Sequence, residues 1–132
     1  MAQAKLTFSM ENYLEAVYEL SAQTGSARVS DIAARMNVSK ASVNNAMNVL
    51  HQRGLVENER YREIYLTEEG RRIGRLTSQK HLILQTLLQE VMGVDEEQAN
   101  EDACAMEHVI SGVSTERILR FLQQQGLSPL TD

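Results

Sequence analysis

Three residues whose side chains are of types that can bind transition metals lie close together in the sequence near the C-terminus: Cys104, Glu107 and His108. In a helix, residues spaced i, i+3 and i+4 project from one face. Thiolate, carboxylate and imidazole groups all bind first-row transition metals, and a thiolate disfavours the hard cations Ca²⁺ and Mg²⁺. The residues between and after them are mostly apolar, so unpaired polar groups there would be costly. The spacing therefore predicts a transition-metal site.

Each of these residues also has an ordinary structural explanation. A lone cysteine usually packs as a small hydrophobe, and a histidine beside a glutamate is usually a surface pair. Cys104 is the single cysteine, so it forms no internal disulfide. A metalloenzyme would need an open coordination position and a substrate cleft. Because the sequence shows no oxyanion hole, phosphate loop or separate base, we expect no enzymatic activity.

Other candidate donors come from two further predicted helices. Asn12 and Glu15 are spaced i, i+3 in the first predicted helix, and His81 lies in a long helix in the middle of the chain. Five or six donors on three helices are enough to close a metal site.

The N-terminal half is predicted to contain three helices and a hairpin. The helices run from about Ser9 to Gly25, from Ser30 to Met36, and from Ser39 to Gly54, with the three serines as expected N-caps. Two short β-prone segments, residues 55–58 and 64–67, then surround a charged turn at residues 59–62. Helix, tight turn, helix and hairpin is the order of a winged helix-turn-helix, whose second helix enters the major groove of DNA.

The rest of the chain is predicted to be helical, over residues 68–92, 95–111 and 114–125. The expected fold is therefore mainly α with a small β-hairpin wing. Residues 1–75 are expected to form the winged helix-turn-helix, and residues 76–132 a helical metal-binding and dimerisation domain, with the first helix contributing to the metal site. Candidate dimer-interface residues are Ile110, Ile118, Leu119 and Leu122.

The polar side chains of the third predicted helix are small or hydrogen-bonding. Asparagine can pair with an adenine edge, serine can contact bases or phosphates, and an alanine methyl can meet a thymine methyl. No acidic residue lies between Asp31 and Glu57. The predicted DNA-contacting residues on this helix are Ser39, Lys40, Ala41, Ser42, Asn44 and Asn45, and Arg28, Arg60 and Arg62 are expected to contact phosphates. The alternative is an ordinary polar helix in a metal-independent winged-helix regulator or protein-interaction module.

Charge is distributed unevenly along the chain. Its net charge is -5, yet residues 28–75 carry nine Lys/Arg and six Asp/Glu, whereas residues 76–132 carry three and nine. This asymmetry favours a nucleic-acid-binding half joined to a half of another kind. We expect neither a signal peptide nor a membrane span, and hence a cytoplasmic protein.

Four segments resemble the iron- and manganese-dependent repressors typified by the diphtheria toxin repressor and the manganese transport regulator. They are MENYLEAVYEL at residues 10–20, RVSDIA at 28–33, LTEEG at 66–70 and DACAMEHVIS at 102–111. The resemblance covers nearly the whole chain and is to the short, two-domain form. It implies a winged helix-turn-helix followed by a helical metal-binding and dimerisation domain.

The resemblance also implies a ligand set: Cys104, Glu107 and His108, joined by His81 and Glu15. Asn12 falls where the family has a Met or Asp ligand. Cys104 resembles the iron-responsive branch, whereas Glu15 with His81 resembles the manganese branch. Gln85 and Asn100 stand where the iron branch has additional ligands.

The expected function is that of a metal-dependent transcriptional repressor of metal-uptake genes, with Mn²⁺ or Fe²⁺ as corepressor. The expected partners are a second copy of the chain and a palindromic double-stranded operator. Zn²⁺, Co²⁺ or Ni²⁺ is expected to bind in vitro, because affinity follows the Irving–Williams order.

Overall fold

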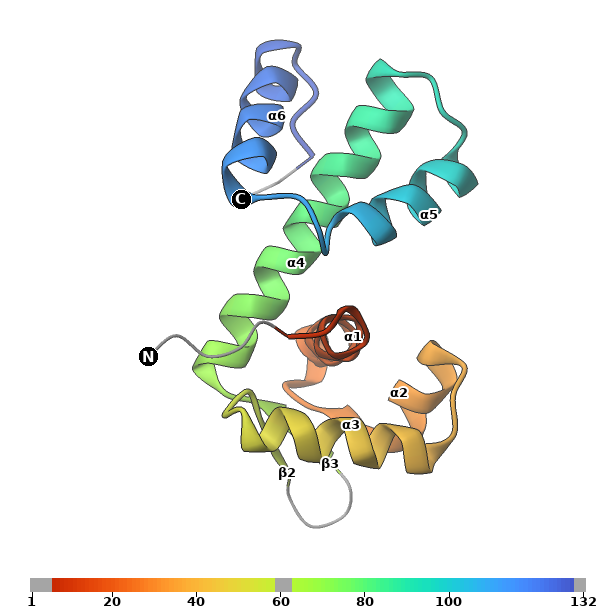
Figure 1. Ribbon diagram of the computed structural model, residues 1–132, viewed down its shortest axis with the longest axis vertical. Helices are drawn as coiled ribbons and strands as arrows, with labels where there is room; N and C mark the ends of the chain where they lie inside the picture. The colour runs from red at the N-terminus through yellow and green to blue at the C-terminus, as the bar shows by residue number, and fades with distance from the viewer. Residues whose placement is uncertain (1–5, 59–62, 130–132) are drawn as a thin grey trace. The chain divides into compact units, whose positions relative to one another are not determined.

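The computed structural model describes residues 6–58 and 63–129 (Figure 1). The helices are α1 (Phe8–Thr24), α2 (Val29–Met36), α3 (Lys40–Gln52), α4 (Glu68–Thr86), α5 (Glu96–Met106) and α6 (Gly112–Gln124), and a π-helical turn at Leu87–Val91 extends α4. The strands are β1 (Ala27–Arg28), β2 (Val56–Asn58) and β3 (Glu63–Leu66). The predicted mainly helical fold with a small β-wing is confirmed.

The chain divides into two compact units between Arg75 and Leu76. In the N-terminal unit, apolar residues of α1, α2, α3 and the sheet form one core. Its fully buried members include Leu14, Val17, Ile32, Val43 and Leu50. Burial of such side chains supplies the main driving force for folding. This core holds α2 and α3 in the predicted helix-turn-helix, with Asn37 in the left-handed conformation at the turn.

The caps of the first three helices only partly follow the sequence prediction. Ser39 caps α3 as expected, because its side chain accepts a hydrogen bond from the Ser42 backbone N–H. The predicted caps Ser9 and Ser30 are wrong. Thr7 caps α1 two residues earlier, and α2 follows Arg28, which makes no side-chain cap. Arg28 is held in an extended conformation by the sheet, so pairing with β3 fixes where α2 begins.

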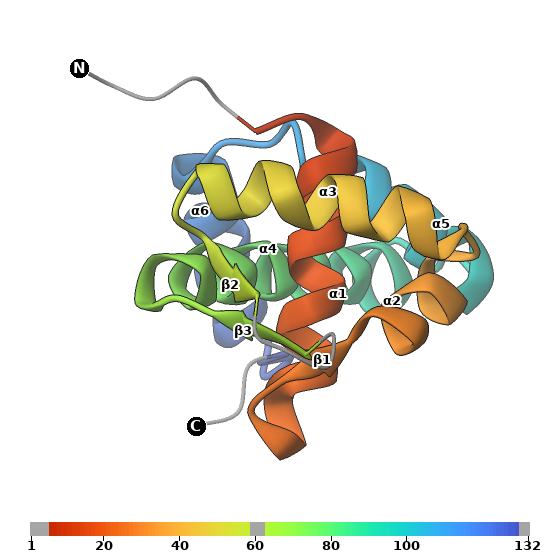
Figure 2. The ribbon, with the colours of Figure 1, turned by 90° about the horizontal axis from the view of Figure 1, so that it is seen from below.

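The wing contains one strand that the sequence did not predict. The strand order is β1-β3-β2, with both pairings antiparallel (Figure 2). In β1, Ala27 pairs with Ile64 and Arg28 with Glu63. Two residues are too few to give a recognisable β pattern. The predicted turn at residues 59–62, including Arg60 and Arg62, lies outside the described residues.

The structure at the start of α4 explains why the LTEEG segment contains Thr67 and Gly70. The Thr67 hydroxyl donates to the Gly54 carbonyl at 2.7 Å and accepts from the Gly70 N–H at 3.1 Å. A Cβ on Gly70 would lie 1.9 Å from the Leu55 carbonyl oxygen, so only glycine allows this approach. On the exposed side of the same turn, a hydrogen bond from Arg72 lowers the pKa of Glu69.

In the C-terminal unit, α5 and α6 flank the later part of α4 (Figure 1). Asp95 and Ser111 cap α5 and α6, each through its side-chain oxygen. Leu84, Ala99, Ala103 and Leu122 are completely buried. Leu122 is therefore unable to meet a partner subunit, and its predicted place in a dimer interface is wrong.

Candidate functional site

The turn that follows α5 brings the Cys104, Glu107 and His108 side chains together. α5 ends at Met106, five residues before the predicted end, and Glu107 is its C-cap residue. The chain then turns, with Ile110 N–H donating to the Met106 carbonyl at 2.9 Å. One ligand atom from each of the three side chains lies within 4.8 Å of the other two. The predicted convergence is found, but the helix end and the turn produce it together.

Glu107 is the most unusual residue of this cluster. Its side chain is 0% exposed, and neither carboxylate oxygen accepts a hydrogen bond from the described residues. His81 Nδ1 lies 3.5 Å from Glu107 Oε1, and His108 Nε2 lies 3.9 Å from the same atom. A buried carboxylate without hydrogen bonds is strongly unfavourable unless a cation compensates it.

His81 reaches this carboxylate from α4. Its Nε2 lies 2.8 Å from Asn100 Oδ1 on α5 and 3.1 Å from Gln85 Oε1 one turn along α4. The ring therefore has amide oxygens on one side and Glu107 on the other. The C-terminal unit thus gathers one thiol, one carboxylate and two imidazoles from α4, α5 and the turn after it.

The chemistry of this donor set fits a divalent transition metal. Cys104 is half-buried, whereas Glu107 and His108 are buried, so the carboxylate has little access to water. Mixed sulfur, nitrogen and oxygen donors suit ions from Mn²⁺ to Zn²⁺ better than Ca²⁺ or Mg²⁺. The two Glu107 oxygens, which accept no hydrogen bond among the residues that the structure describes, are the feature that a bound cation would satisfy.

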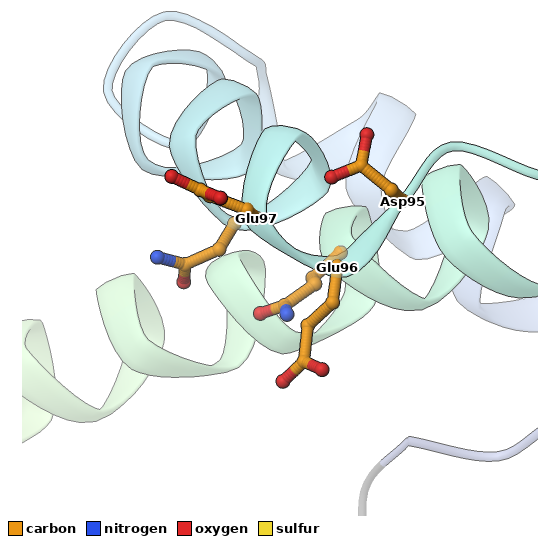
Figure 3. A pocket seen from close by; sticks show the side chains of 5 residues that line it. Asp95, Glu96 and Glu97 are labelled. Atoms are coloured by element: carbon orange, nitrogen blue, oxygen red, sulfur yellow. The ribbon is translucent and has the colours of Figure 1, made fainter.

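A separate pocket in the same unit is lined by Gln85, Asp95, Glu96, Glu97 and Asn100. Figure 3 shows that the carboxylates of Asp95, Glu96 and Glu97 point in different directions. In the described part of the chain, none of them belongs to a group of three potential ligands with converging atoms. The pocket is therefore distinct from the metal-ligand cluster, although Gln85 and Asn100 also contact His81.

Asn12 and Glu15 belong to the N-terminal unit. They lie one turn apart on α1, and both are half-buried. Their neighbours Tyr13, Leu14 and Val17 face the core of that unit, so α1 is firmly packed. Their participation in metal binding stays a prediction.

The polar face of α3 is exposed along its length. Lys40, Ala41, Ser42, Asn44, Asn45 and Asn48 are exposed, whereas Val43, Ala46, Met47 and Leu50 are buried. Ser39 is exposed but its hydroxyl already caps the helix and donates to Ser42 Oγ at 3.1 Å. Val38 and Val49 are 37% and 39% exposed. Their exposure was not predicted from the sequence, because a valine near a helix-turn-helix usually belongs to the core.

Arg28 lies at the sheet end of the same unit. Its side chain is 71% exposed, and its Nε is 3.6 Å from Glu63 Oε1. An exposed pair of this kind contributes little to stability, so the guanidinium can exchange the carboxylate for a phosphate at small cost.

Comparison with known proteins relates both units to one family. The iron dependent repressor N-terminal DNA-binding domain matches residues 5–64, and the metal-binding and dimerisation domain of the same family matches residues 67–130. The HTH-type transcriptional regulator MntR of Lysinibacillus sphaericus is 37% identical over 123 residues, which are 93% of this chain and 88% of that protein.

The chain belongs to the iron-dependent repressor family. The MntR regulator of Bacillus subtilis is 38% identical over 117 residues, covering 89% of this chain and 82% of that protein. Members of this family are transcriptional regulators, and the family assignment makes this chain a DNA-binding, metal-responsive one.

Solved structures of the iron-dependent repressor family share the fold. The manganese regulator SloR has 28% identity and a TM-score of 0.77, covering 86% of this chain and 53% of SloR. The T. acidophilum IdeR structure has 27% identity and a TM-score of 0.74, covering 94% of this chain and 56% of IdeR. The chain thus spans about half the length of these two proteins. Within residues 6–58 and 63–129, no helix has the length and apolar character needed to cross a membrane.

Proposed function

We propose that this family member represses metal-uptake genes, with Mn²⁺ or Fe²⁺ as corepressor bound by Cys104, Glu107, His108 and His81. The observation that carries the proposal is the buried Glu107 carboxylate, which accepts no hydrogen bond from residues 6–58 and 63–129 and lies among one thiol and two imidazoles. We also propose that Glu15 completes the ligand set, and that Asn12 contributes its side-chain carbonyl or a bound water. The proposed role is regulatory, not catalytic, and its place of action is the cytoplasm.

The choice of metal follows from donors and relatives together. Similar proteins include MntR regulators and the manganese regulator SloR, and the family is that of the iron-dependent repressors. Cys104 favours softer ions than Mn²⁺, whereas Glu107 and Glu15 suit Mn²⁺ and Fe²⁺ equally. A structure of the related ScaR holds Zn²⁺. We therefore expect Zn²⁺, Co²⁺ and Ni²⁺ to bind this chain in vitro without being the ions that it senses.

Coupling between metal and DNA follows from the position of Glu15 on α1. α1 packs against α2 and α3 through Leu14 and Val17. When bound, a divalent ion supplies the positive charge that lets Glu15, Glu107 and the Cys104 thiolate share one site. Ligation by Glu15 would then fix the N-terminal unit in one position. DNA and metal would favour the same conformation, and each would raise the affinity for the other by the same factor.

The chain is proposed to read its operator as a homodimer. A single winged helix-turn-helix makes few contacts with DNA, and a dimer with two-fold symmetry matches a palindromic operator. The matching C-terminal family domain is described as a dimerisation domain. In the described C-terminal unit, the most exposed large apolar residues near α6 are Val109, Val113 and Phe121. We propose that these, with the half-buried Ile110, Ile118 and Leu119, contribute to the subunit interface.

DNA contacts are assigned to α3 and to flanking cations. We propose that Lys40, Ala41, Ser42, Asn44 and Asn45 face the major groove. Ser39, Arg28, Arg60 and Arg62 are proposed to contact the backbone. The exposed, acid-free face of α3 supports this assignment.

The test measures DNA affinity as a function of metal. Duplexes are first selected from a random-sequence pool in the presence of Mn²⁺, and binding of the selected duplex is then followed by fluorescence anisotropy at fixed salt, with Fe²⁺ handled without oxygen. We expect Mn²⁺ or Fe²⁺ to raise the affinity about 5- to 150-fold. Glu107→Ala should abolish this gain, and Glu97→Ala, an exposed change on α5, should not. Metal-independent DNA binding by the unaltered protein would instead identify a metal-independent winged-helix regulator, and no selected duplex at all would favour a protein-interaction module.

A further inference from the structure

The side of His81 away from Glu107 is held by two neutral amides. Asn100 Oδ1 and Gln85 Oε1 lie 2.8 Å and 3.1 Å from His81 Nε2. Both are oxygen atoms and can only accept hydrogen bonds. Hydrogen bonds of this length therefore require a proton on Nε2, so the neutral ring must be the Nε2–H tautomer.

The orientation of the Gln85 amide has an independent cause. Its nitrogen, Nε2, donates to Gln89 Oε1 at 2.8 Å one turn farther along the helix. An amide that points its nitrogen towards Gln89 presents its oxygen to His81. Gln89, Gln85 and His81 thus form a directed chain of hydrogen bonds along one helix face, and Asn100 joins it from α5.

When the ring is neutral and its proton is on Nε2, the other ring nitrogen carries a lone pair. That nitrogen, Nδ1, lies 3.5 Å from Glu107 Oε1. In the neutral ring both atoms are electron-pair donors, and a metal ion bound by both would join them. Outer groups that fix the tautomer of a histidine ligand commonly tune its metal affinity.

We propose that Gln85 and Asn100 are positioning residues of the metal centre, which hold the proton of His81 on Nε2 and so present Nδ1 to the metal. The inference rests on the proposed function only in taking His81 as a ligand. It assigns a task to two residues outside the ligand set. Neutral amides suffice for this task, because they orient the ring and leave the charge of the site to the proposed ligands Cys104, Glu107 and Glu15.

The first experiment needs no change to the amides. In metal-free protein labelled with ¹⁵N, two-bond ¹H–¹⁵N correlations distinguish the two imidazole tautomers. The chain has three histidines, and a His81→Gln variant identifies the signals of His81. We expect the Nε2–H tautomer in the unaltered protein. A His81 ring that carries its proton on Nδ1 overturns the proposal.

The second experiment removes the acceptors. In Gln85→Leu/Asn100→Leu protein, we expect loss of the tautomer preference and a fall of about 10- to 100-fold in Mn²⁺ affinity, measured by competition with a fluorescent chelator. Asn100→Asp keeps an acceptor oxygen and should retain at least the original affinity. Gln98→Leu is the matched control, because Gln98 is exposed on α5 and bonds to Asp102 instead.

The outcomes separate this inference from the proposed function. Unchanged Mn²⁺ affinity in the double variant, together with metal-stimulated DNA binding, overturns the role of the amides and leaves the repressor proposal standing. If the double variant does not fold, Asn100→Leu alone is measured; because Asn100 is exposed, this change opens no cavity. An affinity equal to that of Gln98→Leu would then overturn the proposal.

Discussion

Replacing Glu107 by glutamine tests the metal centre through stability alone. Both carboxylate oxygens of Glu107 are buried and accept no hydrogen bond from the described residues. Leaving a buried polar group unsatisfied costs about 1–3 kcal/mol, and more when the group is charged. Glutamine has the same shape without the charge. We therefore expect Glu107→Gln to stabilise the metal-free protein, although most substitutions of buried residues destabilise.

The size of the stabilisation follows from the free-energy cost of keeping the Glu107 carboxylate away from water. Relief of about 1–3 kcal/mol corresponds to a rise in Tm of roughly 4–12 °C for a chain of this size. The opposite change is expected with metal. A metal present at 100 times its Kd stabilises the unaltered protein by about 2.7 kcal/mol, and this gain should be lost in the variant. The variant is thus expected to be more stable without metal and less responsive to it.

The assay is thermal unfolding followed by circular dichroism, with and without Mn²⁺, at one protein concentration because the protein is expected to dimerise. Glu97→Gln, an exposed substitution on α5, is the matched control and should change neither curve. If Glu107→Gln lowers the Tm of metal-free protein, the carboxylate makes a stabilising interaction of its own. The reasoning from the two Glu107 oxygens to a cation site would then be refuted.

Three further predictions concern the N-terminal unit. Asn44→Ala removes an exposed amide from α3 and should weaken binding to the selected duplex by about 1–3 kcal/mol while leaving binding to random DNA unchanged, as measured by anisotropy. Arg28→Ala, which removes an exposed guanidinium, should weaken both and reduce the slope of log affinity against log salt by about 1; an unchanged slope would exclude a phosphate contact. Gly70→Ala would place a Cβ 1.9 Å from the Leu55 carbonyl oxygen, so we expect urea unfolding to show a loss of about 1–3 kcal/mol, and a neutral result would contradict the close approach.

Local sequence signals predicted most of the helical architecture. Ser39, Asn37 and the apolar spacing of Val43, Met47 and Leu50 act over one or two helical turns, and α3 forms where they indicate. The prediction failed where distant residues decide. α2 starts at Val29 because β1 pairs with β3, and Ala27 and Ile64 are far apart in the sequence.

By itself, the sequence determined which donor atoms the chain possesses and that Cys104, Glu107 and His108 lie near one another, because short spacings on a helix and its end are local geometry. Only the tertiary structure decided that Glu107 is buried without a hydrogen bond from the described part of the chain, and that His81 lies between this carboxylate and two amides. Desolvation depends on every element packed around a group, and the partners of His81 come from α4 and α5 together. The spacing of residues in the sequence can indicate candidate ligands. The cost of burying a charge exists only in the folded chain, and this cost is what makes a bound cation favourable.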